Sequence, residues 1–176
     1  LKDLKIYINP GHGGYDSDDR NVTVPPFAQG DHNGFYESKS NLSKGLSMRD
    51  LLEDFGAEVM MSRVTNTTED DRDLTEISLE ANGFVADFFF SIHSNATGTP
   101  TRLNQPLMLY RGFTDDPVRP ENKVMAGILN DHLLENRVAS WSNENPNLRG
   151  DYDFYDWGVG VGLGVLRYLA VPGLLS

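Results

Sequence analysis

Two short apolar runs, each followed by a histidine, constrain the fold of this 176-residue chain more than any other feature. The first run, LKIYIN over residues 4–9, stops at Pro10 and turns through glycine, which leaves His12 just past a predicted strand. The second run, FFFSI over residues 88–92, is apolar and leads directly into His93. Such a run is typical of a strand in the middle of a parallel sheet that is covered on both faces. We therefore expect both histidines at the carboxyl ends of buried strands.

Predicted helices and strands alternate along the rest of the chain. Helices are expected over residues 37–55, 74–85 and 118–137, where apolar residues recur at helical spacing. Their inward faces are predicted to carry Met48, Leu51, Leu52 and Phe55; then Leu74, Ile77, Ala81 and Phe84 or Val85; then Met125, Ile128, Leu129 and Leu133. Strands are expected over residues 58–61, 106–110, 166–169 and 171–175, with polar connections over residues 13–36, 65–73 and 138–157. This order predicts an α/β fold, with a mostly parallel twisted sheet of about six strands flanked by helices on both faces.

Composition narrows the possible functions. The length favours a single domain over residues 1–176. A net charge of −11 disfavours nucleic-acid binding, because the chain has no basic patch to offset it. The lack of cysteine excludes disulfides and thiolate metal sites. Residues 157–175 are apolar, but Arg167, Pro172 and several glycines make them a poor membrane span. No signal peptide is visible in this sequence, and we expect that any export signal was removed or lies upstream.

A third residue can join the two histidines. In open α/β sheets, ligands collect outside the carboxyl ends of the strands, where His12 and His93 are expected. Glu37 opens the helix after the first loop and should reach the same edge. Two histidines and one carboxylate, with a position left for water, are a common catalytic zinc set. Spacing alone leaves a metal site and a structural role for the histidines equally open.

The residues around these side chains resemble those of the zinc-dependent N-acetylmuramoyl-L-alanine amidases, the catalytic domain typified by bacterial cell-division amidases. The matching motifs are INPGHGG, GFYESKSNL and SIHSNA, with weaker matches at GAEV followed by Ser62–Arg63, at Ala81–Asn82 and at the last two apolar segments. The resemblance runs along nearly the whole chain. It implies that His12, Glu37 and His93 bind Zn²⁺, and that the domain hydrolyses the amide between N-acetylmuramic acid and L-alanine. Peptidoglycan, as muramyl peptides, would then be the partner, and the location would be the cell envelope, either periplasmic or secreted.

The sequence departs from this family in three ways. The family places a catalytic glutamate directly after its final strand, whereas this chain stops at Ser176, so we expect the glutamate just past that residue and the domain to be truncated there. The loop over residues 16–34 is longer and richer in proline than usual, which bears on substrate preference. Ile77 stands where the family has an arginine, and we interpret this as a structural change.

Two other functions stay open, the first because of the missing acid and the second because zinc peptidases use a similar ligand set. One is a catalytically incomplete module that binds zinc and peptidoglycan and has a regulatory role. The other, which the sequence favours less, is a zinc carboxypeptidase. The sequence makes no prediction of oligomeric state.

Several further residues allow a functional or a structural interpretation. Asn95 could hydrogen-bond to substrate beside the metal or cap the following loop. His32 could be an alternative ligand, although an exposed loop position is favoured, and His132 is expected on a helix surface. The acidic run over residues 69–73 lacks the spacing of a calcium loop, and the glycine series over residues 158–164 lacks the context of a dinucleotide fingerprint. The aromatic residues over 141–157 could stack on sugars, but packing of a surface loop is favoured.

Overall fold

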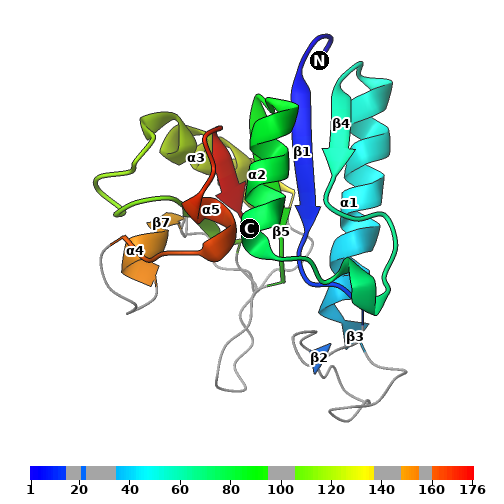
Figure 1. Cartoon of the computed structure of the whole chain (residues 1–176). Helices are drawn as coiled ribbons and strands as arrows, with labels where there is room; N and C mark the ends of the chain where they lie inside the picture. The colour runs from blue at the N-terminus through cyan, green and yellow to red at the C-terminus, as the bar shows by residue number, and fades with distance from the viewer. Residues whose placement is uncertain (15–20, 23–34, 95–105, 137–147, 155–159) are drawn as a thin grey trace.

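In the computed structural model, which describes residues 1–14, 21–22, 35–94, 106–136, 148–154 and 160–176, six strands form one sheet (Figure 1). In spatial order they are β4 (Glu58–Met61), β1 (Lys5–Pro10), β5 (Phe88–Ile92), β8 (Gly173–Leu175), β6 (Met108–Tyr110) and β7 (Leu148–Gly150). The first four are parallel, β6 runs antiparallel to β8, and β7 is parallel to β6. The predicted α/β class with a mostly parallel sheet is therefore confirmed. A separate antiparallel pair joins β2 (Asn21–Val22) to β3 (Phe35–Tyr36).

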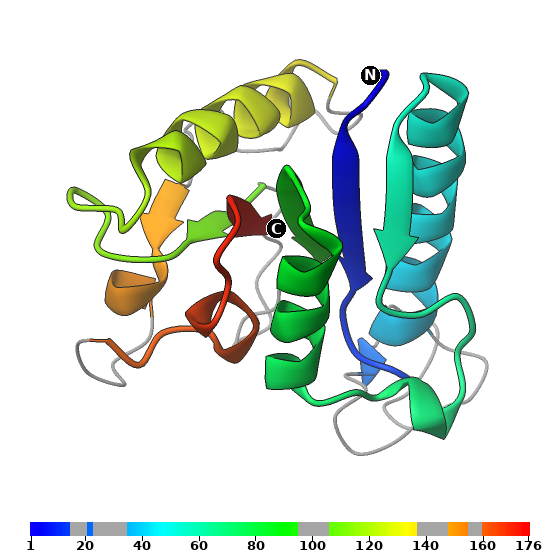
Figure 2. The same ribbon diagram turned by 45° about the horizontal axis from the view of Figure 1, so that its top comes forward.

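Helices cover the sheet on both faces, as expected from the apolar character of β5. Helices α1 (Glu37–Asp54) and α3 (Pro120–Glu135) pack on one face, and α2 (Leu74–Phe84) and the short α5 (Gly164–Arg167) pack on the other (Figure 2). Two short helical segments complete the described structure: η1 (Thr68–Asp70), which precedes α2, and α4 (Asp151–Phe154), which follows β7. Within the described residues, no helix is long and apolar enough to cross a membrane.

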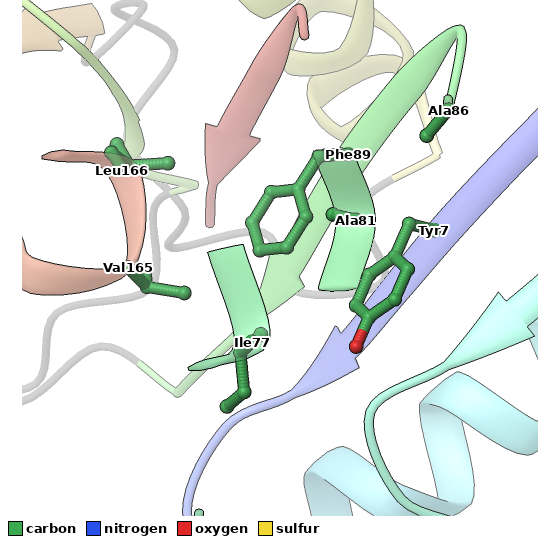
Figure 3. Packing of buried hydrophobic residues seen from close by; sticks show 7 residues of the cluster. All are labelled: Tyr7, Ile77, Ala81, Ala86, Phe89, Val165 and Leu166. Carbon is green, nitrogen blue, oxygen red and sulfur yellow. The ribbon is translucent and has the colours of Figure 1, made fainter. Parts of the chain in front are cut away.

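The core lies in two layers because successive strand residues point to opposite faces. Tyr7 and Phe89 are register partners on β1 and β5, and their rings stack with centroids 5.6 Å apart. Both are fully buried beneath α2 and α5, together with Ile77 and Ala81 of α2 (Figure 3). The next register pair, Ile8 and Phe90, points to the other face, toward α1 and α3. This packing fixes β1 and β5 side by side.

The strand predicted over residues 166–169 is wrong. Residues 164–167 form α5 instead, and the glycine-rich stretch before it turns at Gly160 and Val161. Gly160 and Gly162 have φ angles of +83° and +50°, which an extended strand cannot contain. The sixth strand is β7, which lies in the region predicted to be a surface excursion. Its sequence, Leu-Arg-Gly, carries too little apolar pattern to mark it as a strand.

The predicted inward faces of the helices are only partly right. Met48, Leu52, Ile77, Ala81, Phe84 and Leu129 pack on the core, whereas Leu51, Phe55, Leu74, Val85, Met125, Ile128 and Leu133 are more than a third exposed. Small and polar residues take the buried positions: Ser38, Asn41 and Gly45 in α1, Ser78 in α2, and Asn122, Ala126 and Asn130 in α3.

Small side chains let these helices approach the sheet closely, and buried polar groups gain partners there. A Cβ atom on Gly45 would lie 2.7 Å from Cγ of Pro10, so only glycine allows α1 to sit this close to β1. Asn122 accepts a hydrogen bond from the backbone N–H of Gly173 at 3.1 Å, which ties α3 to β8. Hydrophobic spacing alone does not reveal such a contact surface.

Candidate metal centre

His12, Glu37 and His93 meet at the carboxyl edge of the sheet. One ligand atom from each can be chosen so that all three lie within 4.8 Å of one another, and no other group of this kind occurs among the described residues. Nε2 of His12 and Nδ1 of His93 lie 3.4 Å and 3.2 Å from the same Glu37 oxygen, Oε1. The imidazole rings meet edge to face with centroids 4.9 Å apart. The structure thus brings together the three residues that the sequence singled out.

His12 is presented by a tight turn after β1. The backbone N–H of Gly11 donates to the carbonyl of Ile92 at 2.9 Å, which extends the β1–β5 pairing to the start of the turn. His12 itself has a φ of +62°, a left-handed conformation that costs a non-glycine residue of order 1–3 kcal/mol. The ring of His93 lies directly over Gly11, where a Cβ atom would collide with it. The turn and the second histidine are therefore packed as one unit.

Glu37 is the first residue of α1, as the sequence predicted, and its side chain is 2% exposed. Its Oε1 atom accepts a hydrogen bond from the backbone N–H of Ser94 at 2.9 Å. Burial alone would raise the pKa of this carboxyl group, but hydrogen bonds with His12, His93 and Ser94 outweigh it and hold the pKa below its usual range. Glu37 is therefore an anion at neutral pH.

His93 follows β5, and its backbone is held by the C-terminal end of the described chain. Its N–H donates to the carbonyl of Ser176 at 2.7 Å, and the N–H of Ser176 donates to the carbonyl of Ser91 at 2.9 Å. The β5–β8 pairing thus continues past β8 to the level of His93. Ser176 lies beside the candidate metal centre.

The donor set suits zinc. Imidazole nitrogen and carboxylate oxygen are standard zinc ligands, and a catalytic site uses three protein ligands with one open position. The second carboxylate oxygen of Glu37, Oε2, is buried and has no hydrogen-bond partner among the described residues. A buried, unsatisfied anionic oxygen next to two imidazoles is what a cation would satisfy.

Polar residues that the sequence did not single out as site residues support this edge. Asn9 donates to Oγ of Ser91 at 2.8 Å and accepts from Oγ of Ser62 at 2.7 Å, which links β1, β5 and the residue that follows β4. Asn41, one turn after Glu37, donates to the carbonyl of Gly11 at 3.3 Å. The sequence does carry a signal for these supporting residues, because polar residues stand there at the ends of otherwise apolar strands.

A pocket of about 550 Å³ opens beside the two histidines. Charged residues of the connection before α2 form one wall, including Asp71 and Arg72. Leu74, Ile77 and Val165, from α2 and α5, belong to the apolar wall. A hollow with both apolar and charged walls next to a metal centre is a suitable place for part of a substrate.

The other candidate residues are either structural or surface residues, or lie in parts of the chain that the structure does not describe. His132 is exposed on α3 and lies 3.3 Å from Glu135, as expected for a surface histidine. Within the acidic connection, Asp70 closes a capping box with Thr67, and Asp73 caps the N-terminus of α2. Asn95, His32, most of the loop over residues 16–34, Gly158 and most of the aromatic segment over 141–157 lie outside the described residues.

The family model for N-acetylmuramoyl-L-alanine amidases (Amidase_3) matches residues 6–175 of this chain. The chain therefore belongs to the N-acetylmuramoyl-L-alanine amidase family, as the sequence motifs indicated.

Relatives with curated names agree with this assignment. The chain is 35% identical over 97 residues to the N-acetylmuramoyl-L-alanine amidase CwlM of Bacillus licheniformis, and 37% identical over 97 residues to a sporulation-specific N-acetylmuramoyl-L-alanine amidase of Bacillus subtilis. Each match covers 54% of this chain, and 33% and 32% of the respective relative, so the chain spans about a third of their length. The fold resembles that of the N-acetylmuramoyl-L-alanine amidase AmiC2 of Nostoc punctiforme, with a TM-score of 0.67 and 21% identity over 98% of this chain and 77% of that one.

Proposed function

We propose that this domain is a zinc-dependent hydrolase that cleaves the amide bond between N-acetylmuramic acid and L-alanine in peptidoglycan. The observation that carries the proposal is the meeting of His12, Glu37 and His93 beside a pocket, in a chain that belongs to the amidase family. Family membership favours this activity over a zinc carboxypeptidase or a regulatory binding module. We place the protein in the cell envelope, where this substrate is found.

His12, Glu37 and His93 would hold the zinc ion. Bound zinc acts as a Lewis acid, since it polarises a carbonyl group and makes a water molecule acidic at neutral pH. Glu37 offers a full negative charge for a cation at neutral pH, because hydrogen bonds keep its carboxyl group ionised. The Ser94 N–H fixes one oxygen of this carboxylate and leaves Oε2 available.

Proton transfer needs a further group. We propose that a glutamate directly after Ser176 takes a proton from the attacking water and passes it to the leaving nitrogen. The backbone hydrogen bonds that join Ser176 to Ser91 and His93 support a position for this side chain near the proposed metal centre. General acid–base catalysis of this kind contributes about 10²- to 10⁴-fold. Asn95, two residues after His93, remains our candidate for a hydrogen bond to the substrate.

The proposal is tested by the products of hydrolysis. Zinc-loaded protein that continues past Ser176 is incubated with a synthetic N-acetylmuramoyl peptide, and the products are identified by mass spectrometry. We expect free N-acetylmuramic acid and an intact peptide. Loss of a terminal amino acid would instead identify a carboxypeptidase, and binding of the peptide without cleavage would identify a regulatory module. A His93→Ala variant is the control for contaminating hydrolases.

A further inference from the structure

Arg63, the second residue after β4, is buried, with only 4% of its surface exposed, and it lines the same pocket as His12 and His93. Its Nε–H donates to the carbonyl of Pro10 at 2.8 Å, and Nη2 donates to the carbonyl of Gly11 at 3.1 Å. Nη2 also donates to the carbonyl of Ser38 at 2.7 Å. One guanidinium group therefore joins the turn that presents His12 to the first turn of α1.

The other guanidinium nitrogen extends this link to the connection that follows β4. Nη1 of Arg63 donates to the carbonyl of Thr65 at 2.9 Å and to Oδ1 of Asn66 at 3.0 Å. The same Asn66 oxygen accepts the backbone N–H of Gly14 at 3.2 Å. The histidine turn is thus held from both ends, at Pro10 and Gly11 before His12 and at Gly14 after it.

We propose that Arg63 is a positioning residue of the metal centre, which sets His12 relative to Glu37. Two of its acceptors are the immediate neighbours of these residues in sequence, since Gly11 precedes His12 and Ser38 follows Glu37. His12 and Glu37 come from different elements, a strand-end turn and a helix, so their separation depends on a rigid connection. This inference rests on the proposed function, because it assumes that the two side chains share a metal ion.

Arginine is suited to this role in a way that lysine is not. Its planar guanidinium carries five N–H donors in a fixed geometry, and here they reach five acceptors on three segments of the chain. Lysine keeps the positive charge but has a single ammonium group with three donors on a flexible stem. Arg63→Lys would therefore leave some of these buried carbonyls without a donor and loosen the turn.

The test compares metal affinity at a temperature where each protein is fully folded by circular dichroism. We expect Arg63→Lys to weaken zinc binding by about 10- to 100-fold, the range found when groups that orient metal ligands are removed. We also expect the visible absorption spectrum of the cobalt-substituted protein to change, because the ligand geometry changes. A residue that only supports the fold would alter neither property in protein that remains folded.

Arg111→Lys is the matched control. Arg111 is also largely buried, with its side chain 14% exposed, and it donates to the carbonyls of Gly160 and Val161. It lies beyond β6, away from the three metal-binding candidates, so we expect its replacement to lower stability and to leave zinc affinity and the cobalt spectrum unchanged. If Arg63→Lys does not fold, Asn66→Ala serves instead, because it removes one hydrogen-bond acceptor of Arg63 and the hydrogen bond from the Gly14 N–H. We again expect a loss of zinc affinity.

The outcomes separate the two proposals. The role of Arg63 would be overturned if folded Arg63→Lys keeps wild-type zinc affinity and a wild-type cobalt spectrum. Where Arg63→Lys does not fold, the same result in Asn66→Ala would overturn it. Either result would leave the proposed metal centre intact. Wild-type protein that binds no zinc would overturn the metal centre itself, and the role of Arg63 with it.

Discussion

Replacing Gly11 with alanine should damage the candidate metal centre while sparing most of the fold. The added Cβ atom would lie 2.7 Å from Nδ1 of His93 and closer still to Cε1 and Nε2 of the same ring. Non-bonded carbon atoms rest about 3.5–4.0 Å apart, so the ring must move by more than about 1 Å. Metal–ligand distances tolerate only about 0.2 Å, so we expect zinc affinity to fall by up to about 100-fold.

The cost to stability should be small by comparison. Overpacking costs about 1–3 kcal/mol, and we expect the lower end because the His93 side chain is 25% exposed and can swing outward. Zinc at a hundred times its dissociation constant stabilises a folded protein by about 2.7 kcal/mol. In a domain of this size, that corresponds to a rise in Tm of about 5–11 °C. After a hundredfold loss of affinity, the same zinc concentration adds only about 0.4 kcal/mol, or about 1–2 °C.

The assay is thermal unfolding of the Gly11→Ala protein with zinc and with a chelator. Gly83→Ala is the control, because no described atom outside its chain neighbours and its own helix backbone lies within 4 Å of the added Cβ. Gly83 is in helix α2, so alanine there should raise stability by about 0.5–1 kcal/mol and leave the zinc-induced shift intact. A full zinc-induced shift in Gly11→Ala would refute the packing argument.

Three further changes test separate parts of the structure. His93→Ala should abolish zinc binding and leave the far-ultraviolet circular dichroism spectrum unchanged, since the residue lies past the end of β5; a collapse of secondary structure would show a structural role instead. Val85→Gly should raise the free energy of unfolding, measured by chemical denaturation, by about 1 kcal/mol. Val85 is 68% exposed, and its left-handed φ of +56° suits glycine. A loss of stability would contradict this reasoning. Burial, and then the hydrogen bond to Glu80, raise the pKa of Tyr7, so its contribution to stability is present below about pH 10 and lost as the pH rises further. Tyr7→Phe should flatten the fall in stability between about pH 9 and 11, and an unchanged slope would contradict that assignment.

The sequence predicts most clearly the elements whose burial is nearly complete. The run over residues 88–92 is apolar because β5 lies between β1 and β8 with helices on both faces, and the structure places the strand at those residues. The strand at residues 58–61 also agrees with prediction, although it is a partly exposed edge strand, and so does the start of α1 at Glu37. In each of these elements, the local sequence is enough to predict whether a strand or a helix forms.

Prediction fails where long-range contacts decide the structure. The apolar residues of α3 predicted to face inward are mostly exposed, because Asn122 and Ala126 occupy the buried positions against the sheet. The segment before α5 turns because its glycines adopt positive φ and because Arg111 donates to the carbonyls of Gly160 and Val161. No local pattern in the sequence predicts a hydrogen bond from a distant arginine.

The candidate site likewise contains residues that the sequence identified and a residue whose role it did not. Motif and position identified His12, Glu37 and His93, because a histidine after a buried strand and an acid at a helix start reach a common edge. Their role as zinc ligands stays a prediction. Arg63 could not be assigned a role in this way, since most of its partners are backbone carbonyls, which any residue type can supply.

The most direct test of the metal centre is a crystal structure of the zinc-loaded protein with anomalous diffraction recorded at the zinc absorption edge. We predict a single strong anomalous peak in contact with His12, Glu37 and His93. The absence of a peak at these three residues, in crystals whose zinc content is confirmed by elemental analysis, would contradict the assignment of this edge of the sheet as a zinc site.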